Sequence, residues 1–377
     1  MVLEQLISAD SHVVEPPDLW QSRTDSRFRD KAPRVVRNGD VDNWIVGDDI
    51  LIGSIGGPTQ AGRRYTDLDK LSIEGSYEES PLAAYDPDER LKAMEVDGVV
   101  GEVVYSTIGT RLFTVDVRGE LLAACFRALN DWSADFGAAH PDKLKGTAAI
   151  SFDDVPGAVA EIQRCARLGL SGFVIPAYQS EDQHYDAPEF DPVWSAFEDC
   201  GLPVGIHSGS VRPGPARIGA FANNASVAGT AAFRATQDYW VRRSVAQMMF
   251  GGVFERHPRL KVGVVEYELS WAPYFIRMMD MAYEKHRYVT EITFRDDLLP
   301  SDVFHRNMFV SFQEDELGIA LRDVIGVNNI LFGSDYPHRE STWPRSRQVL
   351  SQVLSGCTDE EKHKIGYLNA ARLYGFN

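Results

Sequence analysis

The chain has 377 residues, of which 44% are hydrophobic and 25% are charged, and its formal net charge is −17. This composition is typical of a globular protein with a large buried core, and it excludes a disordered or fibrous chain. The acidic balance argues against nucleic acid or an anionic membrane as a partner, whereas a small anionic substrate can still bind where arginines gather.

The cysteines and the first residues of the chain indicate the cellular compartment in which the protein is expected. The four cysteines lie far apart and form no C-x-x-C pair, which suits a reducing compartment. Residues 1–10 lack the basic and apolar regions of a signal peptide. No apolar run approaches the roughly 20 residues of a membrane span. We therefore expect a cytoplasmic protein with no membrane partner.

Short apolar runs alternate with helical patterns along the chain. Helical periodicity is clear in residues 86–97, 155–169 and 238–250. Eight runs are predicted strands: LISAD (6–10), GVVGEVVY (98–105), GTAAIS (146–151), GFVIP (172–176), LPVGIH (202–207), LKVGVVE (260–266), MFVSF (308–312) and ILFGSD (330–335). Near-continuous apolar strands belong to a parallel sheet that is covered on both faces.

This alternation predicts a single α/β domain over residues 1–377, folded as a (β/α)8 TIM barrel. An open doubly wound sheet is the alternative fold, but no G-x-G-x-x-G follows an early strand.

A long insertion follows the first strand. Roughly seventy residues precede the first clear helix, far more than a usual βα loop. Within them, residues 44–53 (WIVGDDILIG) predict a hairpin through GDD, and residues 56–65 form a basic, glycine-containing segment. Because βα loops lie at the catalytic end of a barrel, we expect residues 20–85 to form a lid or pocket wall. A dimerisation or packing insertion is the open alternative.

Four side chains able to bind a metal lie at predicted strand ends, where barrel active sites form. Asp10 and His12 follow the first strand, His207 ends the fifth and Asp335 ends the eighth. Residues i and i+2 of an extended segment point the same way, so Asp10 and His12 can bind together. Taken singly, each has a structural alternative, such as a helix cap or a buried histidine. Together they predict one divalent metal, with zinc as the first choice and manganese as the second.

Five segments spread over the chain carry a family resemblance: ADSHVVEPPDLW (9–20), VGIHSG (204–209), HPRLKVGVVEYELSWAPY (257–274), LFGSDYPH (331–338) and NAARLYGF (369–376). The chain resembles the decarboxylase-type branch of the amidohydrolase superfamily, the branch of aminocarboxymuconate-semialdehyde decarboxylase. The resemblance implies that Asp10, His12, His207 and Asp335 bind a single metal, often zinc. It also implies a homodimer.

The sequence departs from this family pattern at two positions. The first ligand is commonly His or Glu, whereas here it is Asp10, whose side chain is shorter. Many family decarboxylases carry a His at the end of the sixth strand, where this chain has Glu266. A carboxylate can act as general acid or base but cannot be a cationic donor. A structural ion pair with an arginine is the alternative for Glu266.

These features predict a metal-dependent enzyme that hydrolyses a small organic substrate, aromatic or carboxylate-bearing, with water activated by the metal. Asp335, Glu266 and His207 are the expected catalytic residues, with Asp335 holding the proton of the water. The alternative is a metal-dependent decarboxylase (carboxy-lyase) of an aromatic or unsaturated acid. A non-catalytic, metal-stabilised binding protein is the remaining alternative.

Other residues near the strand ends are expected to contact the small-molecule substrate. Tyr105 ends the second strand, and His338 and Arg339 lie in the eighth loop. His338 has an alternative role in orienting a metal ligand. His140 and His257 each precede a proline ahead of a strand, so we predict that both are structural and lie at the opposite end of the barrel.

Overall fold

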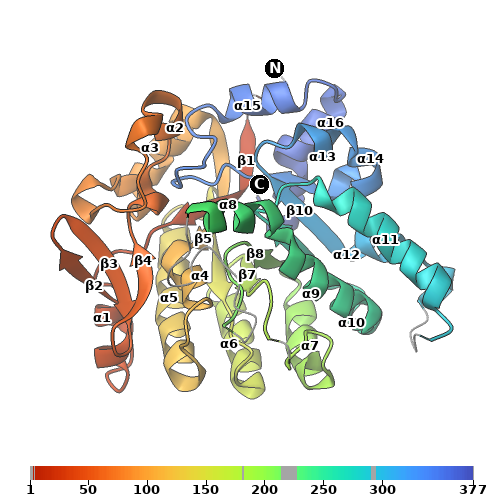
Figure 1. Cartoon of the computed structure of the whole chain (residues 1–377), viewed down its shortest axis with the longest axis horizontal. Coiled ribbons are helices and arrows are strands. Elements are labelled where there is room, and N and C mark those ends of the chain that lie inside the picture. Colours follow the sequence, from red (N-terminus) through yellow and green to blue (C-terminus); the bar gives the residue numbers. More distant parts are fainter. Residues whose placement is uncertain (1–2, 4, 181, 214–226, 290–293, 377) are drawn as a thin grey trace.

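The structure is a computed structural model, and it describes residues 3, 5–180, 182–213, 227–289 and 294–376. Eight parallel strands form one sheet that is nearly closed into a barrel (Figure 1). In sheet order, which is also chain order, they are β1 (Leu6–Val13), β5 (Val99–Ser106), β6 (Leu144–Ala149), β7 (Gly172–Ile175), β8 (Val204–His207), β9 (Val262–Val265), β10 (Met308–Phe312) and β11 (Ile330–Phe332). The predicted (β/α)8 fold is confirmed.

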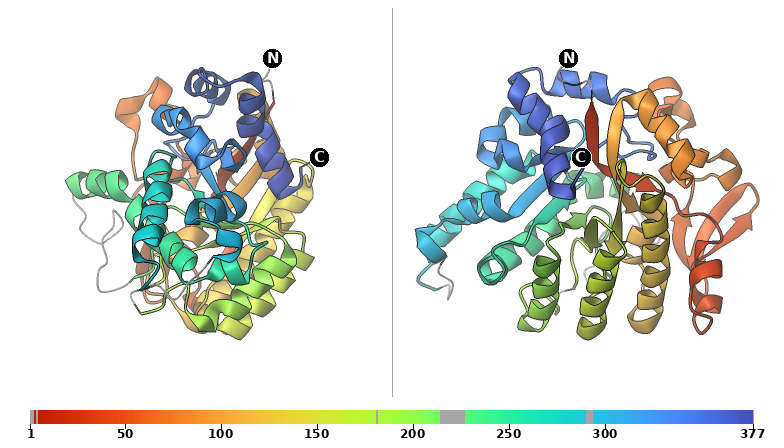
Figure 2. Two further views of the ribbon diagram at one scale, coloured as in Figure 1. Left: turned by 90° about the vertical axis from the view of Figure 1, so that its right-hand side faces the viewer. Right: turned by 180° about the vertical axis from the view of Figure 1, so that it is seen from behind.

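Helices cover the outside of this sheet, and α5, α6 and α7 lie side by side there (Figure 1 and Figure 2). The helices are α1 (Leu19–Arg23), α2 (Arg63–Thr66), α3 (Pro87–Asp97), α4 (Thr107–Leu112), α5 (Gly119–Ala139), α6 (Val155–Arg167), α7 (Asp191–Cys200), α8 (Val227–Thr236), α9 (Asp238–Phe250), α10 (Val253–Arg256), α11 (Trp271–His286), α12 (Pro300–Asn307), α13 (Glu316–Ala320), α14 (Arg322–Ile325), α15 (Ser346–Val353), α16 (Asp359–His363) and α17 (Asn369–Tyr374). The three predicted helices are confirmed as α3, α6 and α9. Among the described residues, no helix has both the length and the apolar character that a bilayer crossing requires.

The strand limits differ from the prediction at the two ends of the sheet. β1 continues to Val13, so Asp10 and His12 lie inside the strand rather than after it. β11 ends at Phe332, three residues before Asp335. Asp335 has a φ of 58°, and a strand cannot continue through a residue in the left-handed region.

The insertion after β1 forms a small antiparallel sheet beside the barrel. Its strands are β2 (Arg34–Asn38), β3 (Val41–Val46) and β4 (Ile50–Ser54). The predicted hairpin is confirmed, because β3 pairs with β4 across residues 47–49. Trp44 of β3 packs inside the insertion, with its ring centroid 5.1 Å from that of Trp20 and its Nε1 donating to Tyr77 Oη at 3.0 Å. Trp20 in turn joins the insertion to the barrel, because its Nε1 donates to Cys125 O of α5 at 3.0 Å.

The barrel closes at a seam between β1 and β11, which do not pair as strands in the described chain. The segment after β11 pairs with β1 instead. Asp335 N–H donates to Asp10 O at 2.8 Å, and His12 N–H donates to Tyr336 O at 2.6 Å. Gly333 allows this approach, because a Cβ there would lie 2.5 Å from Asp10 Cβ. Two backbone hydrogen bonds thus close the barrel next to the predicted metal ligands.

The Arg90 side chain, which is fully buried, holds the same seam. Its Nη1 donates to His12 O at 2.8 Å, and its Nη2 donates to Tyr336 O at 3.2 Å. Its Nε donates to Glu102 Oε2 at 2.6 Å, and the hydroxyl of Ser11 donates to the other oxygen of Glu102 at 3.1 Å. One guanidinium therefore joins both sides of the seam, with a buried carboxylate to balance its charge.

We predict that Arg90→Leu lowers the free energy of unfolding by about 3–5 kcal/mol, because it leaves Glu102 as an unpaired buried charge. Denaturant titration of the wild type and the variant measures this change. The double variant Arg90→Leu/Glu102→Leu should be less destabilised than the single one. Arg167→Leu, which removes an exposed arginine at the end of α6, is the control. Equal losses for Arg90→Leu and Arg167→Leu would contradict the role of the seam.

Candidate metal centre

The structure brings the four predicted metal ligands together at one end of the barrel. His12 Nε2 lies 3.6 Å from Asp10 Oδ1 and 3.6 Å from Asp335 Oδ1. His207 Nε2 lies 3.3 Å from Asp10 Oδ1. A tetrahedral ion with bonds of about 2.1 Å holds its ligand atoms roughly 3.4 Å apart. His12 belongs to two groups of side chains that are close enough to hold such an ion, one with Asp10 and His207 and one with Asp335, Glu266 and His338.

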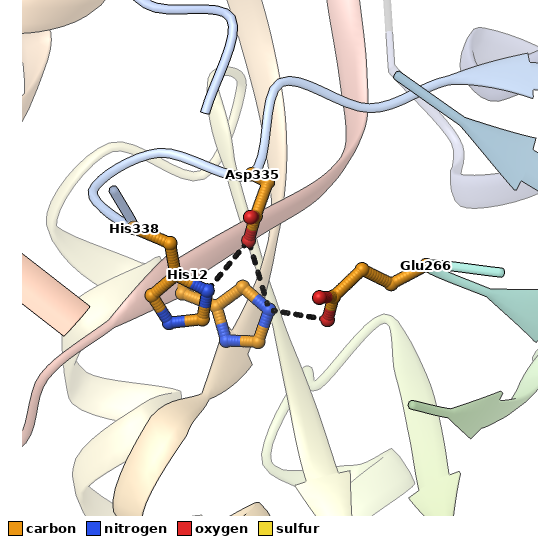
Figure 3. A group of neighbouring side chains, drawn as sticks. All are labelled: His12, Glu266, Asp335 and His338. Carbon is orange, nitrogen blue, oxygen red and sulfur yellow. Dashed lines mark ion pairs between the residues drawn. The ribbon is translucent and has the colours of Figure 1, made fainter. Parts of the chain in front are cut away.

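Two further side chains complete the cluster, as Figure 3 shows. Glu266 points at His12 from the end of β9, with Oε2 at 4.0 Å from His12 Nε2 and at 3.6 Å from His207 Nδ1. His338 Nδ1 lies 2.7 Å from Asp335 Oδ1, and its ring stacks on that of His12 with the centroids 4.0 Å apart. His338 therefore contacts a predicted ligand, as its alternative role of orienting that ligand requires.

Buried polar atoms in the cluster support its fit to a metal. Neither carboxylate oxygen of Asp335 has a hydrogen-bond partner among the described residues, and nor does His12 Nε2. The 2.7 Å contact between Asp335 and His338 is an ion pair without hydrogen-bond geometry. Buried polar atoms without partners are costly, and a cation between these atoms would satisfy them. We find that the donor set fits a divalent metal, while the role of each ligand stays a prediction.

The charges of the cluster shift its pKa values strongly. Burial raises the pKa of Asp335, and the carboxylates of Glu266 and Asp10 raise it further. Burial lowers the pKa of His12, and the repulsion between its protonated ring and the protonated rings of His338 and His207 lowers it further. For His207, burial alone would lower the pKa, but the hydrogen bond to Asp10 and its charge raise it to about 9. Several carboxylates facing one point favour a cation there, which would in turn stabilise their ionised forms.

The backbone is unusual at two cluster residues. Glu266 has a φ of 63° and Asp335 a φ of 58°, values that are uncommon for residues other than glycine. Each conformation is held by a hydrogen bond of the residue's own N–H, from Glu266 to Ser311 Oγ at 3.0 Å and from Asp335 to Asp10 O at 2.8 Å. Backbone strain of this kind gathers at functional sites, and here it turns two carboxylates toward the histidines.

A pocket of about 430 Å³ opens onto the cluster. It is lined by His12, His207, Glu266 and His338, whereas Asp10 and Asp335 lie beneath these side chains, outside the lining. The insertion contributes one wall, including Leu51, Ile52, Pro58 and Ile73. A larger groove of about 980 Å³ between α1, α5 and α6 contains no cluster residue. The insertion thus forms part of the pocket wall, while its action as a lid stays a prediction.

The three residues predicted to contact the substrate differ in whether they reach the pocket surface. His338 and Arg339 line the pocket. Tyr105 is fully buried and is not part of the lining. Its ring centroid lies 5.0 Å from that of His207, and its hydroxyl lies 3.2 Å from that of Tyr374. Tyr105 therefore supports a predicted ligand from below, and its contact with a substrate stays a prediction.

The pocket residues that sequence reasoning missed include Thr107, Arg111 and Arg234. Thr107 Oγ1 lies 3.3 Å from His12 Nδ1 and 3.0 Å from His338 Nε2, so it joins the two stacked rings. The strand-end rule could have found Thr107, because it directly follows β5. Arg234 lies on α8, far from any strand end. Its Nη1 is 3.6 Å from Glu266 Oε1, so the predicted alternative of an ion pair with an arginine is also present.

The two His-Pro histidines lie outside the cluster, as predicted. His140 follows α5 and His257 follows α10, each just ahead of a strand. His140 Nε2 lies 2.7 Å from Asp88 Oδ1. Both residues thus lie at the end of the barrel where the strands begin.

The amino-acid sequence is similar to one protein family and to several characterised enzymes. Residues 104–376 match a protein family described as amidohydrolase. The chain is 27% identical over 302 residues to gamma-resorcylate decarboxylase of Rhizobium sp. (strain MTP-10005), covering 76% of this chain and 86% of that protein. It is 24% identical over 281 residues to 2-amino-3-carboxymuconate-6-semialdehyde decarboxylase of Dictyostelium discoideum, covering 71% of each.

Solved structures resemble the whole chain. An amidohydrolase from Mycobacterium avium subsp. paratuberculosis K-10 superposes with a TM-score of 0.76 at 23% identity, covering 98% of this chain and 99% of that one. A 5-carboxyvanillate decarboxylase from Novosphingobium aromaticivorans DSM 12444, solved with bound manganese and 3-methoxy-4-hydroxy-5-nitrobenzoic acid, gives a TM-score of 0.67 at 15% identity and covers 98% and 97%. At sequence identities this low, the structural similarity shows only that the fold is shared.

We predict that the purified protein carries one divalent ion per chain. Chelation should lower its thermal midpoint, because an ion that binds only the folded chain stabilises it. His207→Ala should weaken metal affinity by more than the roughly 10- to 100-fold that loss of an outer partner of a ligand costs. Thermal denaturation with and without chelator measures the first effect, and metal analysis after dialysis measures the second. His286→Ala, an exposed histidine of α11, is the control, and full metal content in His207→Ala would remove His207 from the site.

Proposed function

Because the chain belongs to the amidohydrolase family, we propose that it is a divalent-metal-dependent decarboxylase that acts on a small aromatic acid. The observation that carries this proposal is the similarity to gamma-resorcylate decarboxylase over 86% of that protein. The hydrolysis expected first from the sequence has no specific support among these relatives. The decarboxylase that was its alternative therefore becomes the proposed activity.

The proposed metal ligands are Asp10, His12, His207 and Asp335. A mixed set of imidazoles and carboxylates accepts both zinc and manganese, and the manganese in the related 5-carboxyvanillate decarboxylase supports manganese equally. When bound, the ion supplies a Lewis acid that anchors and polarises an anionic oxygen of the substrate. The cytoplasmic location and the homodimer stay predictions from the sequence.

Glu266 is the proposed proton donor, since it is the carboxyl group of the cluster that lines the pocket. Its proton forms a C–H bond at the ring carbon that bears the departing carboxylate. The bond between this carbon and the carboxylate then breaks, its electron pair returns to the ring, and carbon dioxide leaves. A proton taken up from bulk solvent then restores Glu266, so one proton is consumed for each carbon dioxide released. Hydroxyl groups on the ring would favour the first step, because they make the ring carbon richer in electrons.

The pocket suits a single planar ring. Its volume of about 430 Å³ lies within the usual range of small-molecule sites, about 300–1,000 Å³. Leu51, Ile52 and Pro58 of the insertion offer apolar surface to such a ring. His338 and Arg339 are the proposed contacts for its polar substituents.

We predict that the metal-loaded protein releases carbon dioxide from at least one member of a panel containing 2,6-dihydroxybenzoate and 5-carboxyvanillate. Glu266→Gln should lower kcat by about 10²–10⁴-fold, the usual contribution of a positioned general acid. Its metal content should stay that of the wild type. Carbon dioxide release and metal analysis measure the two effects.

The matched control is Glu316→Gln, the same change at an exposed glutamate of α13, and it should keep full activity. Wild-type turnover in Glu266→Gln would reduce Glu266 to the structural partner of Arg234. Cleavage of esters or amides without carbon dioxide release from any acid would instead favour the hydrolase.

A further inference from the structure

The hydroxyl of Thr107 lies between two histidines of the cluster. Thr107 is the first residue of α4, directly after β5, and its side chain is buried. Its Oγ1 lies 3.3 Å from His12 Nδ1 and 3.0 Å from His338 Nε2. Within the described part of the chain, it is the hydrogen-bond partner of both nitrogen atoms. One hydroxyl thus connects a histidine of β1 with a histidine of the loop after β11.

The residues on either side of Thr107 are held by the buried carboxylate of Glu15. This carboxylate accepts hydrogen bonds from the Ser106 hydroxyl and from the N–H groups of Ile108 and Gly109, the latter two at 3.0 Å each. The first turn of α4 is therefore tied to the segment after β1. The position of the Thr107 hydroxyl is fixed by the backbone rather than by the histidines that it contacts.

The hydrogen-bonding capacity of the three groups limits where their protons lie. A hydroxyl has one proton to donate, and a neutral imidazole has one nitrogen that donates and one that accepts. The rings of His12 and His338 are stacked with their centroids 4.0 Å apart. Burial and the neighbouring ring disfavour a positive charge on either of them. Every group is satisfied when Thr107 accepts a hydrogen bond from one ring and donates one to the other.

The contact between His338 and Asp335 sets the direction of this chain of hydrogen bonds. His338 Nδ1 lies 2.7 Å from Asp335 Oδ1, and an ionised carboxylate has only lone pairs to offer. The proton of His338 therefore lies on Nδ1, since a lone pair there would face a lone pair of the oxygen. Nε2 of His338 then accepts from the Thr107 hydroxyl, and the hydroxyl accepts from the Nδ1–H of His12. This leaves a lone pair on His12 Nε2, which faces Asp335 Oδ1 at 3.6 Å.

We propose that Thr107 is a positioning residue that fixes the tautomers of His12 and His338, so that His12 offers its Nε2 lone pair to the ion. The opposite tautomer of His12 would place an N–H group at the same point and could not bind a metal. This inference rests on the metal centre of the proposed function. Loss of such an outer partner of a ligand usually costs about 10- to 100-fold in metal affinity.

Zinc binding to the metal-free protein tests the hydroxyl with two variants. Thr107→Val keeps the shape of the side chain and removes the hydroxyl, whereas Thr107→Ser keeps the hydroxyl. Competition with a fluorescent chelator measures the dissociation constant of zinc for each protein. We expect Thr107→Val to bind zinc about 10- to 100-fold more weakly than the wild type, and Thr107→Ser to stay within about threefold of it.

The matched control is Thr110→Val, which removes another buried hydroxyl from the same helix. Thr110 Oγ1 donates to Ser106 O at 2.6 Å and makes no hydrogen bond to a histidine within the described residues. Thr110→Val should therefore bind zinc with wild-type affinity. A loss as large as in Thr107→Val would attribute the effect to general damage in α4 and would overturn the proposal.

Nitrogen NMR of the zinc-loaded protein, labelled at histidine, observes the tautomers directly. In the wild type, His338 should carry its proton on Nδ1, and its signals are assigned by their loss in His338→Phe. In Thr107→Val, the Nε2 resonance of His338 should move downfield, because this nitrogen loses its hydrogen-bond donor. A merely structural role of Thr107 would leave this resonance in place.

Three results would reject the role of Thr107: unchanged zinc affinity in Thr107→Val, an equal loss in Thr107→Ser, or a wild-type His338 with its proton on Nε2. The last result decides even where Thr107→Val fails to fold, because it needs no variant at Thr107. A wild type that binds zinc but releases carbon dioxide from no acid would instead reject the decarboxylase function, and the inference on Thr107 would stand.

Discussion

The seam between β1 and β11 is the constraint on which both the fold and the site depend. The barrel closes there through backbone hydrogen bonds of Asp335 and His12 rather than through a ladder of paired strands. The guanidinium of Arg90 contacts carbonyl groups on both sides of the same gap. Since predicted metal ligands lie on each side, the contacts that close the barrel also set the distance between those ligands. Fold stability and metal geometry are therefore coupled.

Electrostatics explains why such a seam tolerates so many charges. A buried carboxylate is costly unless a cation or several donors face it. On the structural side of the seam, Glu102 has Arg90 as its counter-ion. Next to the pocket, neither carboxylate oxygen of Asp335 has a hydrogen-bond partner among the described residues. Each buried carboxylate needs a positive counter-charge. The chain itself supplies it for Glu102, whereas Asp335 requires a bound cation.

Much of the fold and of the cluster could be predicted from the sequence, because both follow from strand ends. Eight apolar runs gave the eight strands, and His207 and Asp335 were found as polar residues at the ends of such runs. Arg90, Arg111 and Arg234 could not be found in this way. Each lies on a helix, and its importance comes from contacts with distant segments that only the closed barrel creates. The left-handed backbone of Asp335, which the strand prediction through this residue did not foresee, is likewise held by a tertiary contact with Asp10.

The replacement of the family histidine by Glu266 is best understood together with the arginines of the pocket. A histidine at the end of the sixth strand can itself offer a positive charge to an anionic substrate, whereas a carboxylate repels one. In this chain Arg234 lies beside Glu266 and offsets its charge, and Arg111 supplies a cation at another wall. The positive charge of this pocket therefore lies on arginine side chains around the cluster rather than on residue 266. In the proposed decarboxylation Glu266 would deliver the proton, and the insertion after β1, which lines one wall of the same pocket, would limit which acid fits.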